Sequence, residues 1–573
     1  MIGLSRFLAL LAAPLLALPA AAQPAAAQPG NAAGDMAGMH AGHGFPQTLA
    51  DWAHGAQLFP DLGTFHRDAG TRVPAAQAYF DQGMRLLWAF NHDEAARSFA
   101  RAAEADPRCG ICHWGVALTL GPNYNMPMMA AARARVAWES LKRAEALAPG
   151  ATPANRALIQ ALTRRYTGPQ PVDASNSAPL LAAFGDAMRG AARAFPQDDD
   201  ILTLFAEAQM NRNPWKLWNG DGTPARDTPE IVATLETVLA RNPHHPGANH
   251  YYIHAVEAST EPARAVGAAE RIGTMMPGAG HVVHMPSHIL QRVGRYAESA
   301  EANRRADAAD KAYYARTAAI DYYPMYSAHN LQFLAASTAM EGRSAETIKA
   351  LRDVRLVFTD DQAAAMPGMD WGIGYLYQAL VRFGRWDEML AEPRPDARLL
   401  DLTVNWLSAR TIALAATGKL PEAEAELAGL KARIAAAPAD ALAGMNLAAP
   451  LFRIAALRAE ARIALARKDG PRALALLREA VTVEDGLSYN EPSDEFFPTR
   501  HLLGAALLDG GKAAEAEAVF REDLDPRRNP RNGWALLGLA QALKAQGKDA
   551  GAAEKDFAAA WNRADVKLAA PAF

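Results

Sequence analysis

A pair of histidines recurs along this chain at a fixed interval. His250 and His254 stand four residues apart, and His284 and His288 repeat that spacing 34 residues later. Residues four apart lie on one face of an α-helix, and a period of about 34 residues is typical of stacked helix pairs. At 573 residues the chain also exceeds what one hydrophobic core organises. The sequence therefore predicts an all-α array of antiparallel helix pairs.

Residues 76–107 carry the most specific repeat pattern. Small residues stand at repeat positions 8, 20 and 27, a phenylalanine at 24 and a proline at 32, namely Gly83, Ala95, Ala102, Phe99 and Pro107. The small residues let two helices approach, the phenylalanine fills the gap, and the proline ends the second helix. This pattern resembles the tetratricopeptide-repeat (TPR) family. The resemblance implies a helical solenoid over residues 51–573, interrupted by irregular loops at 213–224 and 486–498.

A narrower resemblance is to exported bacterial TPR proteins that carry CxxC-x-WG, LGPNxN and HMPSH segments. Residues 109–115, 120–125 and 284–288 match these segments. The resemblance to that subgroup does not predict a particular activity.

The N-terminus predicts export. Residues 1–22 combine one arginine, an apolar run and an Ala-x-Ala site, as a secretory signal does, and residues 23–50 form a leader expected to be disordered. No later run is long enough for an integral membrane span. The net charge of −4 argues against nucleic acid as a partner. We expect a periplasmic or secreted protein.

The leader also carries thioether and imidazole groups within eight residues, at Met36, Met39, His40 and His43. These groups suit copper, and the thioether favours Cu(I). The alternative is an unstructured leader whose composition is accidental.

The repeated histidines form the main candidate site. The repeat register places six residues on the first-helix face that lines the concave groove in the family, namely His250, His254, Glu257, His281, His284 and His288. Imidazoles from neighbouring helices can converge on one ion, and such a set suits copper, zinc or iron. The ion's role is open between structural, storage and catalytic, so whether the protein is an enzyme is also open. Two alternatives remain: a metal-free groove that binds a protein or peptide of the cell envelope, and purely structural histidines.

Pro286 falls inside the second of these helices. Because proline removes a backbone hydrogen bond, either the helix kinks there or it begins near Pro286. The second case would move His281 and His284 onto a loop.

Cys109 and Cys112 are the only cysteines, and with His113 they form CGICH, the pattern of covalent haem c attachment. In an oxidising compartment the expected state is a disulfide. Haem c and a metal or redox role remain the alternatives.

Overall fold

The protein is built from antiparallel helix pairs that follow one another along the chain. The computed structural model describes residues 46–127, 129, 131–318 and 323–573, and these described residues belong to one compact unit. Within the described residues, the single sheet is a two-stranded hairpin. The predicted all-α repeat fold is confirmed.

The first helices of the pairs are α3 (Pro74–Trp88), α5 (Gly110–Thr119), α7 (Pro153–Leu162), α9 (Asp199–Met210), α11 (Pro246–Val256), α13 (Gly280–His284) with α14 (Pro286–Arg292), α16 (Tyr323–Met340), α19 (Tyr375–Arg382), α21 (Leu400–Ala416), α23 (Ala448–Ala466), α25 (Thr499–Asp509) and α27 (Gly533–Ala545). Their partners are α4 (His92–Ala105), α6 (Ala131–Leu147), α8 (Ser177–Ala194), α10 (Thr228–Arg241), α12 (Val266–Ile272), α15 (Tyr296–Tyr314), α17 (Ser344–Val357), α20 (Trp386–Ala391), α22 (Leu420–Ala435), α24 (Gly470–Asp485), α26 (Ala513–Asp523) and α28 (Gly551–Ala560). The remaining elements are α2 (Leu49–Ala53), α18 (Asp360–Ala365), the 3-10 helices η1 (Ala148–Gly150), η2 (Pro262–Ala265) and η3 (Met369–Gly374), and the antiparallel strands β1 (Leu442–Ala443) and β2 (Asn446–Leu447).

The predicted small residues act as expected between the helices. A Cβ atom added at Gly83 would lie 2.5 Å from the Phe99 ring, and one at Gly115 would lie 2.4 Å from it. Phe99 is therefore clamped between the first helices of two successive pairs. The same arrangement recurs near the C-terminal end, where Phe520 lies against Gly504 and Gly538.

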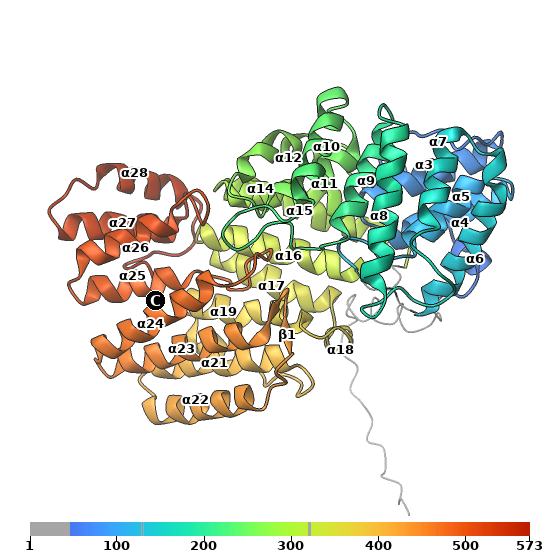
Figure 1. Cartoon of the computed structure of the whole chain (residues 1–573). Coiled ribbons are helices and arrows are strands. Elements are labelled where there is room, and N and C mark those ends of the chain that lie inside the picture. The colour runs from blue at the N-terminus through green and yellow to red at the C-terminus, as the bar shows by residue number, and fades with distance from the viewer. Residues whose placement is uncertain (1–45, 128, 130, 319–322) are drawn as a thin grey trace, which may run out of the picture. The chain divides into compact units, whose positions relative to one another are not determined.

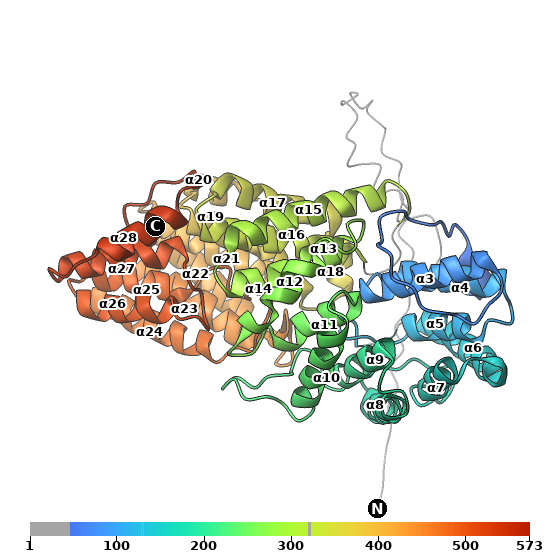
Figure 2. The same cartoon turned by 90° about the horizontal axis from the view of Figure 1, so that it is seen from above.

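The core extends along the array instead of having one centre. One cluster of buried apolar side chains spans residues 52–326, a second spans 300–534 and a third spans 457–553. Figures 1 and 2 both place α11, α12 and α14 between the N-terminal helices α3 to α7 and the C-terminal helices α25 to α28. None of the described helices is long and apolar enough to cross a membrane.

Candidate metal centre

Helix α11 presents the first histidine pair. Pro246 occupies its first turn, and the ring of the N-cap residue His245 accepts a hydrogen bond from the backbone N–H of Ala248 at 3.0 Å. Proline at this position is favourable because its missing N–H would have no helical partner. The helix therefore begins at Pro246, four residues before His250. His250 and His254 point into the protein, with exposed fractions of 0% and 2%.

The second set of histidines lies on a kinked helix. Helix α13 ends at His284 and α14 begins at Pro286, while Met285 between them keeps helical angles of φ −50° and ψ −34°. The kink, and not a late helix start, is thus the correct alternative. His281 and His284 stay on the helix and are buried.

Three imidazoles from these two helices converge. The ring centres of His250 and His254 are 5.1 Å apart, those of His250 and His281 are 5.1 Å apart, and those of His254 and His281 are 6.3 Å apart. Imidazoles bound to one zinc ion at tetrahedral angles, with Zn–N near 2.0–2.1 Å, have ring centres about 5 Å apart. Nitrogen atoms of the three rings lie within 4.8 Å of one another. The spacing suits one shared ion.

The nitrogens of these three rings are also short of partners. His250 Nδ1 lies 2.6 Å from the carbonyl oxygen of Trp88, and His254 Nδ1 lies 2.7 Å from Glu257 Oε1. The Nε2 atoms of both rings, and both ring nitrogens of His281, are buried without a hydrogen-bond partner among the described residues. An unpaired buried polar group costs about 1–3 kcal/mol, and these four nitrogens are available to a ligand.

A network of carboxylates and imidazoles adjoins this trio. His288 Nδ1 lies 2.7 Å from Glu257 Oε2 and 2.6 Å from Glu491 Oε2. Its Nε2 atom lies 2.6 Å from His284 Nε2. This distance indicates a hydrogen bond between the two nitrogens. It is too short for two ligands of one ion, which stand about 3 Å apart. The network continues through His284, because its Nδ1 atom lies 2.6 Å from Asn303 Oδ1.

The charges differ between the trio and the network. Burial, together with the neighbouring histidines, lowers the pKa of His250 and of His281 well below the usual value. Burial lowers the pKa of His254 to about 3. These rings are neutral and keep lone pairs for a ligand. Burial also lowers the pKa of His288, but Glu491 and Glu257 outweigh it and raise that pKa to about 10.

The pKa of Glu491 is also raised. Burial and the charge of Glu257 raise the pKa of Glu491 to about 7, although His288 acts in the opposite direction. Together with His254 and His288, the two glutamates form a second group of possible metal ligands. A third group joins His329 of α16, which is half-buried, to His284 and His288.

Aromatic residues with unusual backbones cover the trio. In most other repeats a glycine makes the turn between paired helices, such as Gly294 with φ 74° and Gly342 with φ 72°, and between α23 and α24 Lys468 makes it with φ 63°. Phe90 takes this place between α3 and α4 with φ 55°, and its ring centre lies 4.3 Å from that of His250. Trp215, with φ 62°, lies edge-on to His254. Left-handed non-glycine residues are strained and concentrate at functional sites.

The cluster is buried, whereas the sequence predicts a groove surface. Phe90 packs on one side of it, and the 486–498 loop brings Tyr489 and Glu491 against the other. The guanidinium of Arg292 lies over the Tyr489 ring at 5.4 Å, which holds the loop against α14. These contacts come from distant repeats, which a local helix register does not encode.

The two cysteines form the expected disulfide, with Cα atoms 5.3 Å apart. His113 beside them is buried, and burial lowers its pKa to about 4. Haem attachment would need both sulfurs, so it requires the reduced form and stays an alternative. Met36, Met39, His40 and His43 of the leader lie outside the described residues, as does the signal segment 1–22.

The fold and this site define a class: an all-α helical-repeat protein with a buried histidine cluster. No protein-family model matches the chain, and no curated protein matches it. Solved structures similar to it include a human IFIT1 dimer with m7Gppp-AAAA, at 13% identity over 79% of this chain and 90% of that one, with a TM-score of 0.34. The TPR domain of P58(IPK) is 10% identical over 82% and 98%, with a TM-score of 0.23. Yeast Tom70 is 12% identical over 82% and 96%, with a TM-score of 0.29.

Proposed function

We propose that this protein binds one transition metal ion through the Nε2 atoms of His250 and His254 and one ring nitrogen of His281. The observation that carries the proposal is the convergence of buried imidazole nitrogens that have no partner among the described residues. An ion would satisfy three of them at once. Neutral imidazole is a ligand that zinc, copper and iron all accept.

The groups behind the rings support this assignment. A ligating histidine usually donates its other N–H to a carbonyl or carboxylate, which fixes the ring and raises its basicity. His250 has the Trp88 carbonyl in this role, and His254 has Glu257. Both rings therefore direct Nε2 toward the shared centre.

The adjoining network takes a different role in the proposal. Doubly protonated His288 donates from Nδ1 toward Glu257 and Glu491 and from Nε2 toward His284, which leaves Glu491 Oε1 as the atom of this network without a hydrogen-bond partner among the described residues. We propose that these groups orient His254 and balance the charge of the centre. Burial among aromatic rings favours a tightly held structural or stored ion; a catalytic role would need an open coordination position.

The protein is proposed to act outside the cytoplasm, on the basis of its signal-like N-terminus. The alternative is a metal-free scaffold for envelope proteins. The buried histidines do not support this alternative. The histidines are buried, with Phe90 and Tyr489 packed against the cluster, so a partner does not reach them without moving side chains.

The test is elemental analysis of protein purified from the exported fraction of cells grown with zinc, copper and iron. We expect stoichiometric metal in the wild type and its loss in a His250→Ala, His254→Ala double variant. The matched control is His245→Ala, which removes a buried histidine of the same segment that pairs with Asp200 at 2.9 Å. Wild-type protein without metal above background would refute the proposal.

A further inference from the structure

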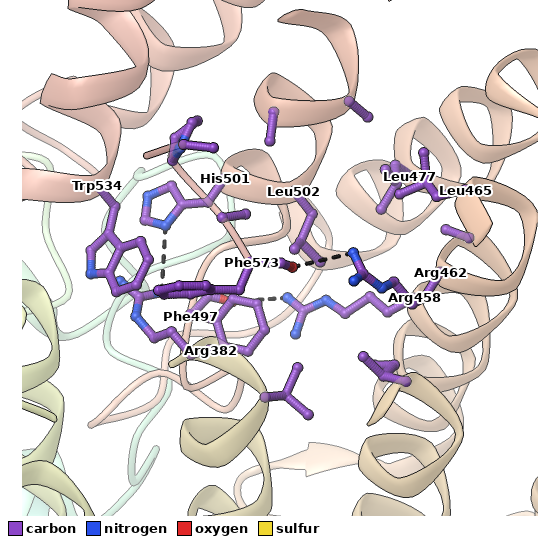
Figure 3. A pocket seen from close by; sticks show the side chains of 18 of the residues that line it. Arg382, Arg458, Arg462, Leu465, Leu477, Phe497, His501, Leu502, Trp534 and Phe573 are labelled. Atoms are coloured by element: carbon purple, nitrogen blue, oxygen red, sulfur yellow. Dashed lines mark hydrogen bonds between the residues drawn. The ribbon is translucent and has the colours of Figure 1, made fainter. Parts of the chain in front are cut away.

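A second candidate site lies in the C-terminal repeats, away from the histidine cluster. A cavity of about 120 Å³ opens between helices α19, α23, α25 and α27. Figure 3 shows three arginines around it, Arg382, Arg458 and Arg462, together with the rings of Trp534 and Phe573. The rest of the lining is mostly apolar, including Leu465 and Leu477.

Arg382 is a buried cation that lacks a direct counter-charge. Its exposed fraction is 4%, and its hydrogen-bond partners are His501 Nδ1 at 3.4 Å and Met340 Sδ at 3.6 Å. Its Nε–H has no partner, and no carboxylate pairs with it among the described residues. Burial lowers its pKa to about 9, so it remains charged near neutral pH.

The nearest acid is already engaged. Asp523 Oδ2 lies 2.8 Å from His501 Nε2 and accepts a hydrogen bond from Asn532 at 2.9 Å. His501 thus stands between the acid and the guanidinium. The Arg382 guanidinium instead lies over Trp534, 4.4 Å from the ring centre.

The other two arginines show the contrast within the same cavity. Arg458 is paired with Glu495 and also bonds to Thr499 and to the Phe497 carbonyl oxygen. Arg462 is half-buried and donates a hydrogen bond from Nη1 to the Phe573 carbonyl oxygen at 3.3 Å (Figure 3). Two of the three guanidinium groups therefore face the cavity with unused capacity for an anion.

We propose that this cavity binds a small organic carboxylate with an apolar body, held at its charged end by Arg382. Charge-assisted hydrogen bonds from a guanidinium to a carboxylate are among the stronger ones in proteins. The apolar body lies against Trp534 and the leucines, and Arg462 adds attraction from the cavity wall. The cavity of about 120 Å³ is smaller than the roughly 150 Å³ that accommodates benzene, so the ligand is a small carboxylate, with an apolar body of no more than four carbons such as that of isovalerate. This site is independent of the proposed metal centre.

The test is isothermal titration calorimetry of the full chain with isovalerate and with its neutral analogue isovaleramide. We expect isovalerate to bind and isovaleramide to bind at least about tenfold more weakly, since a hydrogen bond to a charged group contributes roughly tenfold or more. Equal binding of the two, or no isovalerate binding at millimolar concentration, would overturn the proposal. This comparison needs no variant and so does not depend on folding.

Variants then locate the headgroup. We expect Arg382→Met to weaken isovalerate binding at least about tenfold and Arg462→Met to weaken it several-fold. Arg453→Met is the matched control on α23, because Arg453 is exposed and paired with Glu479 at 2.7 Å. Circular dichroism establishes that each variant is folded. Folded Arg382→Met with wild-type affinity would refute the assigned headgroup site.

Discussion

His288 and Glu491 are 203 residues apart in the chain, yet the Nδ1 atom of one lies 2.6 Å from the Oε2 atom of the other. Both side chains are buried. This contact ties the kinked histidine helix to the loop that follows α24. Since the pair is buried and charged, breaking it has a measurable cost.

We expect Glu491→Gln to lower the urea midpoint and to destabilise the protein by about 1–3 kcal/mol. Removing one partner of a buried ion pair costs about 3–5 kcal/mol, and Glu257 compensates in part because it also contacts His288. The control is Glu479→Gln, which breaks an exposed pair worth about 0–1 kcal/mol. Equal effects of the two substitutions would contradict the role of Glu491.

Removal of metal from protein shown to contain it should lower the melting temperature. An ion present at a hundredfold excess over its Kd adds about 2.7 kcal/mol. Because the proposed ligands lie on α11 and α13, chelation should raise amide exchange chiefly between residues 245 and 300. Exchange that stays unchanged there would place the ion elsewhere, with His40 and His43 of the leader as the next candidates.

We expect the pH dependence of the free energy of unfolding to reflect the titration of Asp401. Burial and the charge of Asp370 raise the pKa of Asp401 from 3.8 to about 8. The folded state therefore binds this proton more tightly than the unfolded state. The stabilisation is fully present below about pH 4 and is lost as pH rises through about 8.

We expect Asp401→Asn to flatten the fall in stability between those limits, by up to about 1.4 kcal/mol for each pH unit. Urea unfolding at a series of pH values measures the slope. Asp440→Asn, at an exposed position, serves as the control. An unchanged slope in the Asp401 variant would show that this carboxyl titrates alike in both states.

Gly115→Ala should destabilise the array by about 1–3 kcal/mol, as overpacking does. Its new Cβ would stand 2.4 Å from the Phe99 ring. Gly190→Ala in α8 is the matched control, since nothing lies within 4 Å of the added atom, and there alanine should stabilise the helix by up to about 1 kcal/mol. Adding Phe99→Leu should recover part of the Gly115→Ala loss. Thermal unfolding followed by circular dichroism compares all three.

Co-expression with cytochrome maturation machinery should leave the protein without a Soret band. The peptide that contains Cys109 and Cys112 should show no added mass, because both sulfurs are joined in a disulfide. A covalent haem adduct on that peptide would prove this expectation wrong.

The repeat pattern predicts the helices well because their packing is local. Gly83 and Phe99 meet within one pair, and the register places His250 and His254 on one face of α11. The same register brings His281 beside them across one repeat boundary. Period and composition are enough for these contacts.

The other half of the site has no periodic signal. Glu491 and Tyr489 lie in an insertion, whose path depends on anchors such as the bond from Trp371 Nε1–H to the Asp494 carbonyl oxygen at 2.7 Å. Phe90 does leave a trace in the sequence, because it stands at the turn position where most other repeats have glycine. An aromatic residue at such a position identifies a turn that serves the site as well as the fold.

The contact between α14 and the 486–498 loop has a mechanical consequence. A solenoid whose repeats touch only their neighbours stretches and bends like a spring. Here the bond between His288 and Glu491 joins two points about 200 residues apart, so the intervening repeats form a closed loop. Tension applied between these two residues acts on this bond first, and the repeats between them unfold together once it breaks.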